Sequence, residues 1–91
     1  MKTYDEINQR IENMENYRYS DSLVRIYGTE KEFDANFLYG FMRGLQHVLK
    51  ERLDESHIRQ NYSYLKETPE QTKSILGERN AYAWCLDWNT Q

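Results

Sequence analysis

The chain has 91 residues and a formal net charge of −3 at pH 7, from fifteen acidic and twelve basic side chains. Proteins that bind phosphate backbones carry a basic excess, so this balance argues against non-specific binding to DNA or RNA. Aromatic residues make up 14% of the chain, which is too high for a disordered protein. We expect one folded domain over residues 1–91, small enough that a homo-oligomer or a protein partner covers part of its apolar surface.

The chain has one cysteine, Cys85, and no apolar run of the roughly 20 residues that a membrane span needs. It also lacks the apolar core of a secretory signal at its N-terminus. A lone cysteine cannot form an internal disulfide, which favours a reducing compartment. We therefore expect a cytoplasmic protein without membrane contact, in which Cys85 is a packed core thiol.

The first expected helix covers about residues 3–15. Thr3 and Glu6 have the spacing of a capping box, in which each side chain satisfies a backbone N–H of the first turn. Apolar residues follow at helical spacing, namely Tyr4, Ile7, Ile11 and Met14. A helix of this length is marginal alone in water. It must dock on the central helix of the chain or on a neighbouring subunit.

Residues 16–28 fit two structures. Leu23, Val24, Ile26 and Tyr27 share one face of a short helix, but parts of the segment also alternate as a strand does. A lone strand has no evident partner in this sequence. The pattern therefore favours a short helix that ends at Gly28.

The central element is a long helix over about residues 29–54. Thr29 and Glu32 form a second capping box at its start. Its apolar residues recur every three or four positions and so share one helical face: Phe33, Phe37, Phe41, Leu45, Val48 and Leu49. This segment organises the predicted core.

Gly40 and Gly44 lie four residues apart inside the central helix, and therefore on one side of it. Each glycine costs about 1 kcal/mol of helix stability relative to alanine, and close approach by another element is the usual compensation. We expect these two glycines to form a helix-packing notch. An aromatic side chain from the last helix is its expected occupant.

Residues 54–67 predict a short irregular helix or a long ordered connection. The last helix is expected over about residues 68–88, with Thr68 as N-cap, Pro69 at the first helical position and Gln71 at the capping-box position. Its apolar arc widens toward the C-terminus, which is therefore its most buried part or the part that meets a partner. The predicted fold is an all-α domain of three main helices, with the last helix antiparallel to the central one.

The sequence shows no arrangement for catalysis or for a metal or cofactor. No nucleophile lies beside a base, and no glycine-rich loop follows a strand. His47 and Glu51 lie on one helical turn, but two ligands are too few for a metal ion. Surface histidines are the expected interpretation of His47 and His57, and we expect no enzyme activity.

Tyrosines interleaved with basic residues are the main feature outside the core. The residues concerned are Tyr17, Arg18, Tyr19, Arg25, Arg59, Tyr62, Tyr64 and Lys66. Such rings and guanidinium groups can stack on a nucleotide base and contact its phosphates. Tyr and Arg are also enriched at protein–protein hot spots, and amphipathic cover for a small core is a third explanation.

The central helix contains the pattern GF-x-x-G-L-x-x-x-L, formed by Gly40, Phe41, Gly44, Leu45 and Leu49. In this pattern and in its small size and composition the chain resembles accessory proteins encoded by phages and prophages. That resemblance implies stoichiometric binding that inhibits a host protein or defence system. The first hypothesis is thus a non-enzymatic interaction protein, the second an oligomer that sequesters a small nucleotide signal, and the least supported a DNA-binding regulator.

Overall fold

The computed structural model describes residues 1–17 and 35–88. The short helix predicted before Gly28 and the capping box predicted at Thr29 lie outside these residues. The same holds for Arg18, Tyr19 and Arg25, and for the side chain of Tyr17.

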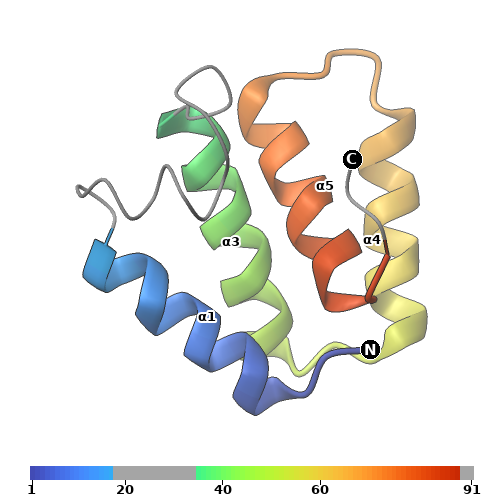
Figure 1. Cartoon of the computed structure of the whole chain (residues 1–91). Helices are drawn as coiled ribbons and strands as arrows, with labels where there is room; N and C mark the ends of the chain where they lie inside the picture. The colour runs from blue at the N-terminus through green and yellow to red at the C-terminus, as the bar shows by residue number, and fades with distance from the viewer. Residues whose placement is uncertain (18–34, 89–91) are drawn as a thin grey trace.

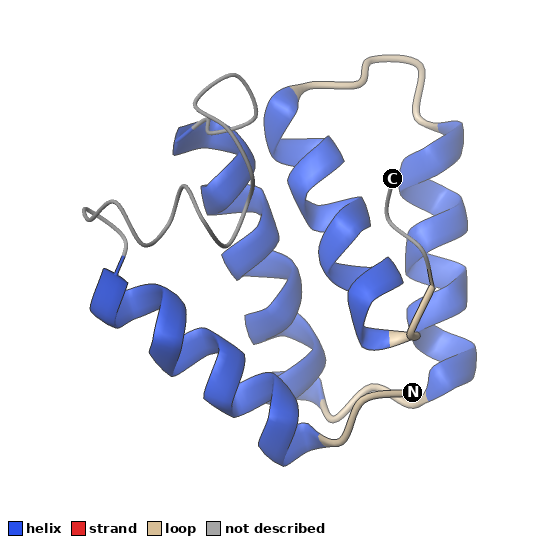
Figure 2. Cartoon of the chain, in the orientation of Figure 1, coloured by secondary structure: helices blue, strands red, loops and turns tan. Residues whose placement is uncertain are grey.

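The described residues form four helices and no strand (Figures 1 and 2). These are α1 (Tyr4–Tyr17), α3 (Ala35–Glu51), α4 (Glu55–Glu67) and α5 (Lys73–Cys85). The prediction of an all-α chain is confirmed. The prediction of three main helices is wrong, because residues 55–67 form a regular helix of their own.

The central helix α3 and the C-terminal helix α5 run parallel, so the predicted antiparallel arrangement is wrong. Figure 1 shows α3 descending, α4 returning beside α5, and α5 descending again next to α3. The contacts advance in the same direction along both helices: Gly40 lies against Ser74, and Gly44 against Ala81. The physical reason is α4, which carries the chain back to the end of the molecule where α3 begins.

Local capping explains why α4 forms. The Asp54 carboxylate accepts a hydrogen bond from the backbone N–H of His57 (2.9 Å) at the first turn. Arg59 forms an ion pair with Glu55 one turn earlier (2.8 Å). Ile58 is fully buried and fixes the inward face.

The last helix starts at Lys73, four residues later than the Pro69 that was predicted as its first residue. Thr68 caps the C-terminus of α4, and Pro69 follows as a helix breaker. The Gln71 side chain donates to the carbonyl oxygens of Leu65 (2.8 Å) and Thr68 (2.6 Å). Gln71 therefore completes α4, and Thr72 is the N-cap of α5, since its hydroxyl accepts from Ile75 N–H (3.1 Å).

Both α3 and α5 end in a Schellman motif, three residues before the ends predicted from the sequence. Leu53 N–H donates to Val48 O (3.1 Å), and Trp88 N–H donates to Ala83 O (2.9 Å). Between each pair the chain turns through a left-handed residue, which is Arg52 (φ 50°) in one motif and Asp87 (φ 62°) in the other. Each motif sends the chain in a new direction.

The core lies where α1, α3 and the C-terminal half of α5 meet. Its buried residues are Ile7, Ile11, Met14, Phe41, Leu45, Val48, Ile58, Ala81, Tyr82, Cys85 and Leu86. The apolar positions expected for the first helix and the central helix supply six of these. The C-terminal part of α5 is buried, whereas Ile75 and Leu76 near its start are half-exposed.

Small residues bring α3 and α5 into backbone contact. A Cβ added to Gly40 would lie 1.9 Å from the carbonyl oxygen of Ser74, and one added to Gly77 would lie 2.0 Å from that of Phe37. A Cβ on Gly44 would lie 2.7 Å from the Cβ of Ala81. The neighbours nearest to the Gly40 and Gly44 notch are thus the α5 backbone and the side chains of Ala81 and Glu78, and not the aromatic ring that was expected. We call this contact the α3–α5 crossing.

Polar contacts fix α1 and the N-terminal residues. Lys2 N–H donates to Cys85 O (2.7 Å), and the Lys2 side chain forms an ion pair with Asp87. At the start of α1, the Tyr4 hydroxyl donates a hydrogen bond to Leu53 O (2.9 Å), just after the end of α3. The first helix therefore closes over the ends of both α3 and α5.

Candidate functional site

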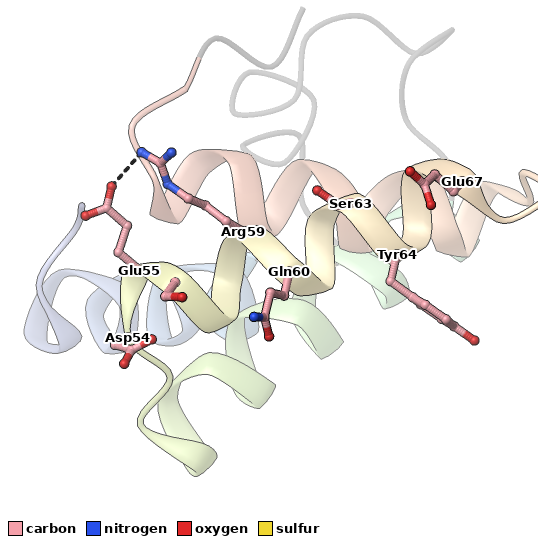
Figure 3. Close-up of a pocket in the computed structure, with 8 residues that line it drawn as sticks. Asp54, Glu55, Arg59, Gln60, Ser63, Tyr64 and Glu67 are labelled. Atoms are coloured by element: carbon pink, nitrogen blue, oxygen red, sulfur yellow. Dashed lines mark hydrogen bonds and ion pairs between the residues drawn. The ribbon is translucent and has the colours of Figure 1, made fainter.

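The predicted binding residues of α4 divide between two sides of the helix. Arg59, Tyr62 and Lys66 follow each other at three- and four-residue spacing and so share one side. Figure 3 shows Arg59 and Tyr64 pointing in different directions from the helix axis. Tyr64 is 75% exposed, whereas Tyr62 is half-buried between α4 and the C-terminal residues.

Tyr62 belongs to a row of alternating cations and rings between α4 and α5. The Arg59 guanidinium lies 5.5 Å from the centre of the Trp88 ring, and Trp88 meets Tyr62 edge to face at 5.1 Å. The Arg79 guanidinium lies 5.7 Å from the Tyr62 ring. We call these four residues, Arg59, Trp88, Tyr62 and Arg79, the aromatic–arginine ladder.

Further contacts hold the ladder in place. Glu55 pairs with Arg59, and Gln71 accepts a hydrogen bond from Arg79 (2.7 Å). The Schellman motif positions the backbone of Trp88, while this residue remains 38% exposed. The ladder is therefore an ordered surface with a partly exposed tryptophan.

Sequence analysis found only half of this ladder. Arg59 and Tyr62 were candidate site residues, whereas Trp88 and Arg79 were not among them. The helix ends at Cys85, and the turn at Asp87 redirects Trp88 toward α4. An aspartate at this position gives little warning of a helix end, since glycine is the usual residue there.

A shallow, open depression runs along the exposed side of α4 (Figure 3). It is lined by Asp54, Glu55, Ser56, Arg59, Gln60, Ser63, Tyr64 and Glu67. Three of these residues are acidic, and the single basic residue, Arg59, is already paired with Glu55. A surface built from one helix and rich in carboxylates is poorly suited to a nucleotide phosphate.

A hydrogen-bonded network crosses from α3 to α5. Tyr82 is buried and donates its hydroxyl to Glu78 Oε1 (2.9 Å). The phenol has one proton, so His47, whose Nδ1 lies 2.9 Å from the phenol oxygen, must donate to it through Nδ1–H. Burial, followed by the nearby Glu78 carboxylate, raises the pKa of Tyr82 well above its usual range. His47 is thus a half-buried structural residue and not a free surface histidine.

The single cysteine, Cys85, is buried in the core. Burial raises the pKa of the Cys85 thiol to about 12, so it stays protonated and unreactive near neutral pH. Over residues 1–17 and 35–88, no three His, Cys, Asp or Glu side chains gather at a site that could hold a metal ion.

None of the four described helices is long and apolar enough to cross a membrane.

Comparison with family models, curated proteins and solved structures yields no match for this chain. Function must therefore be inferred from the surfaces described above.

Proposed function

We propose that the protein is a non-enzymatic interaction protein that docks a protein partner on the aromatic–arginine ladder. The supporting observation is the composition and order of this surface. Trp, Tyr and Arg are the residues most enriched at protein–protein hot spots, and here they already contact one another in the chain alone. Preordered side chains lose less conformational freedom on binding, which favours affinity.

The charge around the ladder favours an acidic partner. Arg59 and Arg79 supply two positive charges within the ladder, Arg59 is paired with Glu55, and the exposed Lys66 follows Tyr62 by one turn of α4. Lys66 forms no ion pair with any residue in the described ranges. Complementary charges accelerate association and select among partners, so a partner with surface carboxylates fits best.

The resemblance to phage and prophage accessory proteins suggests the kind of partner. Such a protein would act in the cytoplasm by binding a host enzyme or a component of a defence system in a fixed ratio and blocking it. A helical domain is compatible with this mode of action. The proposal concerns binding and inhibition together.

The proposal can be tested by affinity capture from a host lysate with the purified chain and matched variants. Trp88→Ala and Lys66→Glu should each remove the captured protein, because they delete the exposed indole and reverse a free charge. Tyr39→Ala is the control, since Tyr39 is also well exposed, at 64%, but lies on α3. Capture that is unaffected by both ladder variants would refute the assignment of this surface.

A second candidate function is the sequestration of a nucleotide-type signal. One observation favours it: the partly exposed Trp88 ring lies beside Arg59, and a base could stack on such a ring while its phosphate meets the cation. A ligand at 100 times its dissociation constant adds about 2.7 kcal/mol to folding stability. Thermal shift across a nucleotide panel tests this, and a flat panel would eliminate the candidate.

A further inference from the structure

The turn that follows α5 contains an aspartate in a backbone conformation that aspartate seldom adopts. Asp87 has φ 62°, in the left-handed region where glycine is the most common residue and asparagine the next. The hydrogen bond from Trp88 N–H to Ala83 O (2.9 Å) closes the turn around it. A left-handed residue with a side chain persists where its surroundings hold it in place. We therefore expect the contacts of the Asp87 side chain to stabilise this turn.

Lys2 contacts the end of α5 in three ways. Its backbone N–H donates to Cys85 O (2.7 Å), its ammonium group pairs with the Asp87 carboxylate, and this ammonium group lies 5.1 Å from the centre of the Trp84 ring. The α-amino group of Met1 adds a second ion pair with Asp87 (3.1 Å). The first residues of the chain thus hold both the last carbonyl of α5 and the side chain at the left-handed turn.

Trp88 lies directly beyond this turn and enters the aromatic–arginine ladder from it. The centre of its ring lies 5.1 Å from that of the Tyr62 ring and 5.5 Å from the Arg59 guanidinium. Both of these partners belong to α4, whereas the backbone of Trp88 is anchored on α5. The conformation of Asp87 therefore decides whether the indole ring reaches α4.

We propose that the ion pair between Lys2 and Asp87 is a latch that keeps Trp88 in the ladder. Lys2 is then a positioning residue, since it acts on the ladder through Asp87. Without the ion pair, the turn can relax toward the right-handed or extended conformations that most residues prefer, and residue 88 is then directed away from Tyr62. The consequence for partner binding rests on the proposed function, whereas the latch itself does not.

The latch would make the ladder responsive to the residues at the start of the chain. Coupling between two sites is reciprocal, so a partner bound to the ladder should in turn strengthen the attachment of Lys2. The side chains of Lys2 and Asp87 are 25% and 47% exposed. Salt should therefore weaken the latch.

Substitutions at positions 2 and 87 test the latch without any partner. Lys2→Glu places a second carboxylate beside Asp87 and should release Trp88, whereas Lys2→Arg keeps the positive charge and should retain it. Lys2→Gln removes the charge without adding repulsion and should have a smaller effect than Lys2→Glu. Lys50→Glu on α3 is the matched control, because it makes the same charge change at an exposed residue far from Asp87 in the sequence.

Asp87→Gly separates the ion pair from the turn. Glycine adopts the left-handed conformation readily and needs no side-chain contact to do so. The ladder should therefore stay closed in Asp87→Gly, and Lys2→Glu should have no further effect in that background. This double-mutant cycle isolates the contribution of the ion pair.

The measurement is NMR spectroscopy of the Trp88 indole N–H signal and of the nuclear Overhauser contacts between the Trp88 and Tyr62 rings. Lys2→Glu should lose these ring contacts, while Lys2→Arg, Lys50→Glu and Asp87→Gly should keep them. Circular dichroism melts verify that each variant folds. Ring contacts that survive in folded Lys2→Glu would overturn the proposal, and so would their loss when Lys2→Glu is introduced into Asp87→Gly.

Partner capture distinguishes the latch from the proposed function. A Lys2→Glu variant that loses the ring contacts but still captures the partner would refute the ladder as the docking surface and would support the latch. The latch itself is judged by the contact between the Trp88 and Tyr62 rings alone.

Discussion

Asp54 lies just before α4 and Asp87 lies just after α5, and the side-chain carboxylate of each forms hydrogen bonds or ion pairs there. The Asp54 side chain accepts hydrogen bonds from the backbone N–H of His57 and from its Nδ1, which lies 2.7 Å away. The Asp87 side chain pairs with Lys2 and with the α-amino group of Met1 (3.1 Å). Hydrogen bonds from His57 lower the pKa of Asp54, and those from Lys2 and then the α-amino group lower that of Asp87.

We expect these two carboxylates to make the fold sensitive to acid. An aspartate whose pKa is lower in the folded state stabilises the protein above its ordinary pKa of about 3.9, and this contribution disappears as the pH falls further. The free energy of unfolding should therefore decrease from about pH 5 downward. Urea titrations at a series of pH values, followed by circular dichroism, measure this decrease.

Asp54→Asn provides the control for this acid sensitivity. Asparagine caps a helix about as well as aspartate but carries no charge. The variant should stay close to the unmodified chain in stability at pH 7 and lose less stability on acidification. An identical pH profile would show that the Asp54 carboxylate does not contribute.

The Tyr82 hydroxyl is the polar centre of the α3–α5 contact, with one neighbour on each helix. Tyr82→Phe should lower the free energy of unfolding by about 1–2 kcal/mol, because Glu78 and His47 each lose a hydrogen-bond partner while the ring still fills its site. Tyr64→Phe is the matched control, since the Tyr64 ring is 75% exposed. Denaturant titration of both variants decides the outcome, and equal effects would contradict a role for the network.

At the scale of elements, the α3–α5 crossing should be the contact between helices that tolerates amino-acid substitution least. Alanine normally stabilises a helix by about 1 kcal/mol over glycine, yet Gly77→Ala should destabilise the fold by about 3 kcal/mol. Its Cβ would lie 2.0 Å from the Phe37 carbonyl oxygen, and a backbone atom cannot move aside without shifting a helix. Thermal melts of Gly77→Ala, beside Ser63→Ala on the exposed side of α4, test this. Stability that is unchanged or higher in Gly77→Ala would show that the two backbones can separate at little cost.

The sequence predicted the individual helices of the described residues better than their arrangement. The spacing of Ile7, Ile11 and Met14, and that of Phe41, Leu45 and Val48, identified two core faces correctly. Helix α4 was left undecided because Ile58 is its only fully buried residue, so its apolar pattern is sparse. Because α4 was not recognised as the helix that carries the chain back, the last helix was expected to run antiparallel to the central one.

The start of α5 shows a second limit of sequence patterns. Thr68 and Thr72 both have the chemistry of an N-cap, and Pro69 after Thr68 favoured the earlier one. Which threonine caps α5 depends on the hydrogen bonds of the Gln71 side-chain amide. This amide donates to the carbonyl oxygens of Leu65 and Thr68 at the end of α4. Half of the aromatic–arginine ladder was missed for a similar reason, since Asp87 at the turn pairs with Lys2, which lies at the other end of the sequence.

At the scale of the whole molecule, α1 should be the least protected helix of the core. It contributes Ile7, Ile11 and Met14 from one side only, whereas α3 lies between α1 and α5. We expect native-state hydrogen exchange to be faster in α1 than in α3 and α5, because α1 can open without disturbing the α3–α5 crossing. Uniform exchange across the three helices would instead indicate a single cooperative unit.

Ile11→Ala tests this independence. The Ile11 side chain is 7% exposed, so its truncation should cost about 3 kcal/mol and should accelerate exchange mainly in α1. Asn8→Ala on the exposed side of the same helix is the control and should change little. Equal acceleration in α5 would contradict a separate opening of α1.

The backbone contact at the α3–α5 crossing also restricts how this protein can evolve. Natural selection can replace exposed residues of α4 freely, whereas Gly40 and Gly77 each face a carbonyl oxygen that leaves no room for a side chain. Descendants of a common ancestor should therefore retain small residues at Gly40, Gly44, Ser74, Gly77 and Ala81, even after their surfaces have diverged. These five positions, at fixed spacing within each helix and variable spacing between the helices, would identify distant homologues.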